Sequence, residues 1–264
     1  MKKFLGLTVA ILIFVVQVGC GNSTANSENV NENASSSNTN LQDENQISTS
    51  ADKNDTIAEQ IKLIADNFDS WKIGDETDFG AYAVTDIDNN GRLEIISSSC
   101  RGTGLFSNNN VWQVNENMDG LEKCNQNINE EDSQPDLISY DNVDAYYDSQ
   151  KNIYYLIFDD LSRNGMAEYY ENKRAWSLQG NEIKQNYLAH KTTVYTDEEN
   201  AQITCKDAND NPITQEEYKN IADKVYSGLK KVSVKISWVN TQDLTDKDKI
   251  YDALYDSYKN FSIK

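Results

Sequence analysis

Oxygen-bearing side chains alternate along one short segment of the chain, DIDNNGRLE. Asp86, Asp88 and Asn90 stand at its first, third and fifth positions, and Glu94 stands at the ninth. Calcium binds six to eight hard oxygen atoms at about 2.4 Å, and a chain can supply them from alternate residues around a glycine that allows a sharp turn. The carbonyl of Arg92 would add a ligand at the seventh position. These residues therefore predict a calcium site.

The pattern DxDxNGxxE resembles the calcium loops of EF-hands and of the FG-GAP and VCBS repeats found in secreted proteins. An EF-hand has a bidentate Glu at position 12 and a helix on each side. This chain has Ser97 at that position and strand-like flanks, YAVT and LEIIS. The nine-residue loop of the repeats fits better, with Glu94 where such loops usually carry Asp. The resemblance implies a calcium ion held on a hairpin between two strands.

The same segment has a second interpretation. Asn90 and Gly91 between two apolar runs are also a strong signal for a β-hairpin, in which the aspartates would only be solvated. The residues alone leave both the calcium loop and the empty turn open. A further segment with alternate oxygens, Asp207 to Pro212, has proline in place of the glycine, so we interpret it as a polar turn before a helix.

Other groups that could do chemistry are sparse. The single histidine, His190, excludes zinc sites built from several histidines, and we interpret it as an ordinary residue near a strand end. The sequence has no GxSxG, HExxH or CxxC motif, so no residue is assigned a catalytic role. These observations favour a binding protein over an enzyme.

Strand-like runs flank the predicted calcium loop and continue along the middle of the chain. They are rich in β-branched and aromatic residues and are separated by Gly and Asn turns, which is typical of antiparallel hairpins. The runs cover residues 81–87, 93–99, 111–114, 143–147, 153–158, 167–178, 183–188, 201–205 and 232–239.

Helices are predicted on both sides of these strands. A capping box starts at Thr56, and apolar residues at helical spacing continue to Trp71. A second capping box starts at Thr214 with helical spacing as far as Leu229, and a last helix begins at about Asp246. The predicted fold class is α+β: an antiparallel β-sheet of hairpins with an N-terminal helix and two C-terminal helices.

Adjacent tyrosines occur on three of the predicted strands. Successive strand residues face opposite sides of a sheet, so each pair places one ring outside the core. If neighbouring strands carry them, Tyr147, Tyr155 and Tyr170 would form an aromatic platform for a sugar or a peptide. The alternative is that they are ordinary sheet tyrosines covered by the terminal helices.

Three cysteines follow the first fifty residues: Cys100, Cys124 and Cys205. Outside the cell a disulfide is allowed, and a bond between Cys100 and Cys124 would bridge two predicted strands. Free buried thiols are the alternative, since an odd number leaves one cysteine over.

Charge and composition limit the classes of partner. The chain of 264 residues has 43 Asp and Glu against 24 Lys and Arg, a formal net charge of -19. So acidic a chain forms no continuous basic patch, which excludes nucleic acid as an expected partner. Aromatic residues make up 10% of the chain, which is typical of a folded domain.

Residues 1–19 predict a secretion signal. Two lysines precede an apolar run from Phe4 to Val16, which is too short for a permanent membrane span. The placement of Cys20 directly after Gly19 resembles the lipobox of bacterial lipoproteins, with Gln17 where the pattern usually has Leu. The resemblance implies that Cys20 is lipidated and holds the protein on the extracytoplasmic face of the cell membrane. An ordinary signal peptide, which would leave a freely secreted protein, is the alternative.

The next segment, residues 20–55, predicts a tether. It is rich in Asn and Ser and has no aromatic residue, so it cannot bury enough apolar area to offset its ordering entropy. Such a segment resembles the stalk of surface lipoproteins of Gram-positive bacteria. Residues 56–264 are predicted to form one α+β domain.

These features together predict a lipid-anchored cell-surface protein with a calcium-stabilised binding or scaffolding domain. Its expected partners are the membrane, through lipidated Cys20, and a glycan or protein ligand. The rival function is a surface hydrolase that acts on glycan or peptide. A third is a domain that only supports partner lipoproteins.

Overall fold

The computed structural model describes residues 50–73, 79–102, 105–126, 134–196, 200–244 and 246–264. The predicted signal peptide, Cys20 and nearly all of the predicted tether lie outside the described residues. Within the described part, no helix is long and apolar enough to cross a membrane.

Two helices begin the described chain: α1 (Ser50–Asp66) and the short α2 (Phe68–Trp71). The prediction that a capping box at Thr56 starts the first helix was wrong, since α1 begins at Ser50, inside the segment assigned to the tether.

One sheet follows these helices and holds the predicted calcium loop. Its strand order is β13-β1-β2-β3-β4, and each neighbouring pair is antiparallel. The strands are β1 (Phe79–Thr85), β2 (Glu94–Arg101), β3 (Phe106–Val114), β4 (Leu121–Lys123) and β13 (Val239–Asn240). We call it the first sheet.

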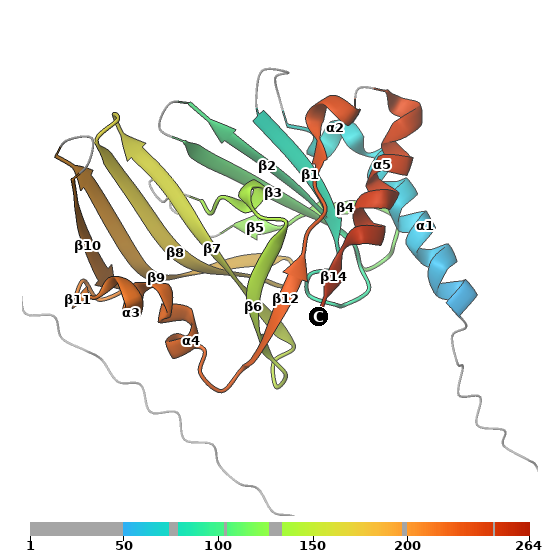
Figure 1. Ribbon diagram of the computed structural model, residues 1–264. Coiled ribbons are helices and arrows are strands. Elements are labelled where there is room, and N and C mark those ends of the chain that lie inside the picture. The colour runs from blue at the N-terminus through green and yellow to red at the C-terminus, as the bar shows by residue number, and fades with distance from the viewer. Residues whose placement is uncertain (1–49, 74–78, 103–104, 127–133, 197–199, 245) are drawn as a thin grey trace, which may run out of the picture. The chain divides into compact units, whose positions relative to one another are not determined.

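The second sheet is larger and is built mainly of long hairpins (Figure 1). Its order is β11-β10-β9-β8-β7-β6-β12-β14, and β5 pairs with β9 in parallel. The strands are β5 (Asn125–Gln126), β6 (Asn142–Asp148), β7 (Ile153–Asn164), β8 (Glu168–Gln179), β9 (Glu182–Tyr195), β10 (Ala201–Asp207), β11 (Pro212–Ile213), β12 (Lys230–Lys235) and β14 (Ser262–Ile263).

The remaining helices lie toward the C-terminus: α3 (Gln215–Lys219), α4 (Ile221–Val225) and α5 (Lys247–Asn260). The capping box predicted at Thr214 is confirmed, with its side chain accepting from the N–H of Glu217. The single helix predicted behind it is two short helices, because Asn220 leaves helical geometry with ψ near 8°. Short 3-10 helices cover η1 (Leu137–Ser139) and η2 (Thr241–Leu244).

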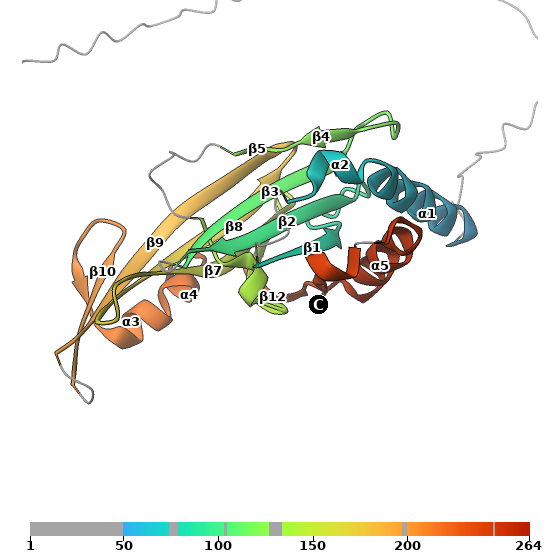
Figure 2. The same cartoon turned by 90° about the horizontal axis from the view of Figure 1, so that it is seen from above.

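Three apolar clusters hold these elements together. The first lies between the two sheets, the second between the first sheet and α1 with α5, and the third between the second sheet and α3 with α4. Typical members are Ile96 and Trp176 in the first, Ile61 and Leu254 in the second, and Tyr146 and Ile221 in the third. Figure 2 shows α1 and α5 beside β1 on one side and α3 and α4 beside the second sheet. The predicted α+β class is confirmed, with two sheets instead of one.

Among the described residues, part of β3 has no neighbouring strand on its outer side. β4 pairs only with residues 112–114 of β3. Farther along this edge, the N–H of Asn109 donates to Oε1 of Gln134 at 2.6 Å, and its carbonyl accepts from Nε2 of Gln126 at 2.7 Å. Two glutamine side chains thus take the place of a strand at Asn109.

Candidate metal centre

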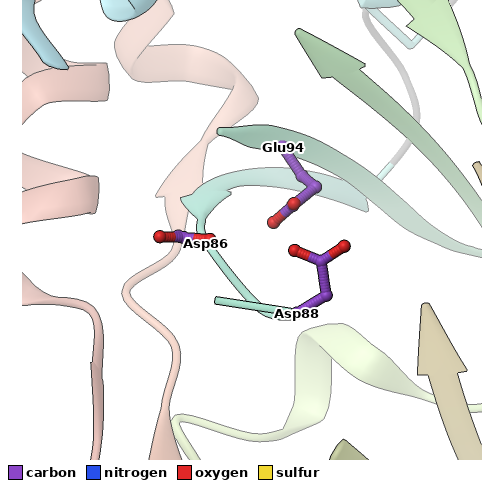
Figure 3. A group of neighbouring side chains, drawn as sticks. All are labelled: Asp86, Asp88 and Glu94. Carbon is purple, nitrogen blue, oxygen red and sulfur yellow. The ribbon is translucent and has the colours of Figure 1, made fainter. Parts of the chain in front are cut away.

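The loop between β1 and β2 brings three carboxylates together. Asp86 directly follows β1, Asp88 lies in the loop, and Glu94 is the first residue of β2. One carboxylate oxygen from each lies within 4.8 Å of the other two. Figure 3 shows the carboxylates of Asp88 and Glu94 pointing toward one another, with Asp86 beside them. The alternate spacing in the sequence therefore corresponds to a cluster in space.

Glu94 lies at the bottom of this cluster and is fully buried. Its Oε2 accepts from the hydroxyl of Thr85 at 2.9 Å and from the N–H of Ile87 at 2.8 Å. Its Oε1 accepts from Nε2 of Gln113 at 2.9 Å. Burial raises the pKa of Glu94 well above its usual value of 4.5, and the charge of Asp88 raises it further, despite these hydrogen bonds.

The two aspartates are held by the backbone of the loop. Asp88 is 8% exposed, and it accepts from the N–H of Asn90 at 3.2 Å and from the amide of Asn90 at 2.7 Å. Burial raises the pKa of Asp88, and the charge of Asp86 adds to the effect. Asp86 accepts from the N–H of Gly91 at 3.1 Å. The cluster thus concentrates negative charge at a position with little access to water.

Positive φ angles at two residues allow the sharp turn of the loop. Asn89 has φ of 54° and Gly91 has φ of 85°, values that asparagine and glycine tolerate better than other residues. The predicted role of Gly91 in a sharp turn is confirmed by this angle. A side chain at Gly91 would be strained although nothing lies within 4 Å of the position of its Cβ.

Two glutamines that the motif does not include connect the loop to other elements. Gln60 of α1 is 2% exposed; its Nε2 donates to the carbonyl of Gly91 at 2.9 Å, and its Oε1 accepts from the N–H of Leu93 at 2.8 Å. Gln113 of β3 lies directly across the sheet from Glu94. The sequence offers one indication that Gln60 and Gln113 have a structural role: each is a polar residue at a position where the apolar pattern predicts burial.

The other two predicted ligands are Asn90 and the backbone carbonyl of Arg92. Oδ1 of Asn90 accepts from the N–H of Arg92 at 2.7 Å, and Nη1 of Arg92 donates to the carbonyl of Val114 at 3.3 Å. The structure therefore brings together the carboxylates of Asp86, Asp88 and Glu94, and the Asn90 side chain bonds within the same loop, to Asp88 and to the N–H of Arg92. The ligand role of the Arg92 carbonyl stays a prediction.

Three carboxylates so close repel one another, and either protons or a cation can relieve that repulsion. The cluster can hold a metal ion. A further atom supports this capacity: Oε1 of Gln113 is buried and has no hydrogen-bond partner in the described part of the chain. The two ends of a side-chain amide differ little in shape, so rotating it would present this oxygen to the cluster as a neutral ligand.

The predicted tyrosine platform is not formed by its three members. Tyr147 pairs across the strands with Tyr154, and Tyr155 pairs with Tyr146, so Tyr147 and Tyr155 lie on opposite faces of the second sheet. Tyr155 stacks on Tyr226 of the α4 end at 4.8 Å between ring centroids. Helices cover this ring, as the alternative interpretation expected.

Tyr170 shares a face with Tyr147 but lies far along the strands. It pairs with Ser162 of β7, eight residues from Tyr154, which corresponds to roughly 26 Å along an extended strand. The rings of Tyr147 and Tyr170 therefore cannot contact one ligand ring together.

The remaining reactive side chains have ordinary surroundings. His190 lies within β9 and not near a strand end as predicted, because β9 continues to Tyr195; its Nδ1 lies 2.6 Å from the hydroxyl of Tyr187. Cys100, Cys124 and Cys205 are free thiols. Burial raises the pKa of Cys124 to about 12, and the charges of Glu94 and Asp88 contribute to this rise. Such a thiol stays protonated and is a poor nucleophile.

No protein-family model matches the chain, and no curated protein or solved structure matches it either.

Proposed function

We propose that the protein is a lipid-anchored cell-surface protein whose α+β domain is stabilised by one calcium ion and serves as a binding or scaffolding module. The observation that carries the proposal is the convergence of Asp86, Asp88 and Glu94 on one buried point. The signal-like leader and Cys20, together with the Asn- and Ser-rich segment after it, support a place on the outer face of the membrane.

The donor atoms of the cluster favour calcium over other metals. All three side chains supply oxygen, and neither histidine nor cysteine belongs to the cluster. Zinc prefers nitrogen and sulfur ligands, whereas calcium and magnesium prefer oxygen. Calcium tolerates irregular geometry and long ligand distances better than magnesium, which demands a near-ideal octahedron. A short loop with carboxylates from three positions suits the more tolerant ion.

A bound ion would act mainly on stability. The loop connects β1 to β2, contacts α1 through Gln60 and contacts β3 through Gln113. Neutralising its charge would therefore strengthen four elements at once. When the free concentration of the ion is a hundred times its dissociation constant, binding stabilises the folded state by about 2.7 kcal/mol.

Thermal unfolding of the full chain with and without calcium tests this proposal. We expect about 1 mM calcium to raise the melting temperature over that in EGTA. The rise should be lost in the double variant Asp86→Ala/Asp88→Ala and kept in Asp207→Ala/Asp210→Ala, which removes two carboxylates from the other polar turn. Magnesium at the same concentration should give a smaller rise. An unchanged melting temperature of the wild type would refute the calcium role.

A further inference from the structure

Two adjoining pockets flank β3, and none of the described residues that line them is acidic. The first has a volume of about 240 Å³ and lies between the end of α2 and one face of the first sheet. The second, of about 290 Å³, lies at the edge of β3 beside Gln126 and Gln134. Both are lined by Asn108, Asn110 and Lys123. We call them the β3 pockets.

The absence of acids from the described lining is notable in this chain, which has 43 acidic and 24 basic residues. A negatively charged ligand is repelled by an acidic surface, whereas among the described lining residues of the β3 pockets it would meet Lys123 and no carboxylate. Figure 2 shows α2 next to β3 and β4, the elements that supply most of the described lining of the first pocket.

The floor of the first pocket is built from alternate residues of β3. Asn108 and Asn110 pair across the sheet with Ser99 and Ser97, so their side chains share the face that is toward α2. Among the described residues, neither amide makes a side-chain hydrogen bond. Asn109 between them has its oxygen bonded to Ser98 and its nitrogen bonded to the carbonyl of Pro135. The side chain of Asn109 is therefore bonded within the structure, whereas the amides of Asn108 and Asn110 face the pocket.

The wall of the first pocket combines an aromatic ring with a cation. Trp112 pairs across the strands with Lys123, whose ammonium lies 5.8 Å from the centroid of the Trp112 ring. Lys123 has no ion pair with a described residue, whereas Lys72 at the opposite side is paired with Asp69 at 2.6 Å. Of the two lysines that line the first pocket, Lys123 is therefore the one that no described carboxylate neutralises.

These groups select a particular chemistry. An amide both donates and accepts, so Asn108 and Asn110 match hydroxyl and N-acetyl groups, which also do both. The aromatic wall suits the apolar face of a sugar ring, and Lys123 suits a carboxylate. We propose that the β3 pockets bind a saccharide that carries an acidic group. This inference rests on the proposed binding role and names its ligand class.

A pair of tetrasaccharides that differ in charge tests the inference. The acidic probe alternates glucuronate with N-acetylglucosamine, and the neutral probe contains N-acetylglucosamine alone. Binding to the full chain is followed at low ionic strength, because salt screens an exposed charge pair. Calorimetry gives the affinities, and nitrogen-15 NMR identifies the residues that move. We expect the acidic probe to bind at least about tenfold more tightly and to shift the signals of Asn108 and Asn110.

Two variants locate the site. Lys123→Gln should reduce the affinity for the acidic probe to that for the neutral one, whereas Lys184→Gln, the same change at an exposed lysine outside the pockets, should have no effect. Asn110→Ala should weaken both probes by about tenfold. Because Lys123 is exposed, its variant remains informative even if Asn110→Ala fails to fold.

Three results would overturn the inference: equal affinity for the two probes, binding that Lys123→Gln does not change, or no binding of either probe up to about 10 mM. Failure of the wider proposal is seen separately, since the calcium-dependent melting temperature is measured without any saccharide.

Discussion

The backbone N–H of Leu93 donates a buried hydrogen bond of 2.8 Å to Oε1 of Gln60, 33 positions earlier in the chain. The amide nitrogen of the same glutamine holds the carbonyl of Gly91. One side chain of α1 therefore fixes the loop that carries the carboxylate cluster, and the order of that loop depends on the docking of α1.

Removing this side chain should weaken both the fold and the metal site. Gln60→Ala leaves the N–H of Leu93 buried without a partner, and such a loss costs about 1–3 kcal/mol. We expect a lower midpoint in urea without calcium, and a several-fold weaker calcium affinity by calorimetry. Gln150→Ala, at an exposed position, is the control. An unchanged calcium affinity would show that the loop keeps its shape without α1.

Replacing Glu94 should make the calcium-free protein more stable at neutral pH. The folded pKa of Glu94 lies above 4.5, so the folded state holds a proton more strongly than the unfolded state. Its contribution to stability is therefore full below pH 4.5 and is lost as the pH rises to the folded pKa. Glu94→Gln has no proton to lose, and rotation of the Gln113 amide lets its oxygen accept from the new amide.

The measurement is thermal unfolding in EGTA at about pH 5 and about pH 8. Glu94→Gln should melt a few degrees higher than the wild type at the upper pH, a change of about 1 kcal/mol. It should gain less from added calcium. Glu122→Gln, at an exposed glutamate, should behave as the wild type. A lower melting temperature of Glu94→Gln in EGTA at the upper pH would contradict the expectation.

The ring of Tyr226 should be essential for the packing of α4. It stacks between Tyr146 and Tyr155, at 5.3 and 4.8 Å between ring centroids. Tyr226→Ala should destabilise the protein by about 3 kcal/mol in urea unfolding, because it leaves a cavity between two rings. Tyr226→Phe keeps the stacking and loses only a 3.3 Å contact with Asn186, so it should cost less than about 1 kcal/mol. Equal effects of the two variants would show that the hydroxyl, not the ring, matters.

Substitution of Cys20 tests the proposed anchor. Cys20→Ala should move the protein from the membrane fraction to the soluble fraction, because the acyl chains supply the membrane affinity. Mass spectrometry of the mature N-terminal peptide should find acyl chains in the wild type. Cys205→Ala, at a buried thiol, should stay in the membrane fraction. An unmodified cysteine in the wild type would refute lipid anchoring.

Strand positions follow from the sequence because their signals are local. Asn164–Gly165 and Gly180–Asn181 separate long β-rich runs, and these two turns connect β7 to β8 and β8 to β9. The pairing of β6 with β12 has no such signal, since it joins Tyr147 to Lys230 without a turn between them. The division into two sheets depends on such long-range pairings and was not predictable from periodicity.

The metal centre likewise has a part that the sequence predicts and a part that only the fold reveals. The carboxylates of Asp86, Asp88 and Glu94 are visible as a spacing, because one short loop carries them all. Gln60 and Gln113 come from α1 and β3, and only the fold shows that they contact that loop. For the adjacent tyrosines, the sequence correctly predicts that the two rings of a pair face opposite sides of the sheet, but it does not predict which of the two faces α4 covers.

The capped edge of β3 has a consequence for the protein at high local concentration. An open strand edge can pair with the edge of another molecule and start aggregation. Gln134 and Gln126 occupy the hydrogen-bonding groups of Asn109 with side chains, which offer no continuous backbone for a further strand. Two molecules that meet at this edge therefore lack the free backbone groups of Asn109 that joining into a common sheet would use.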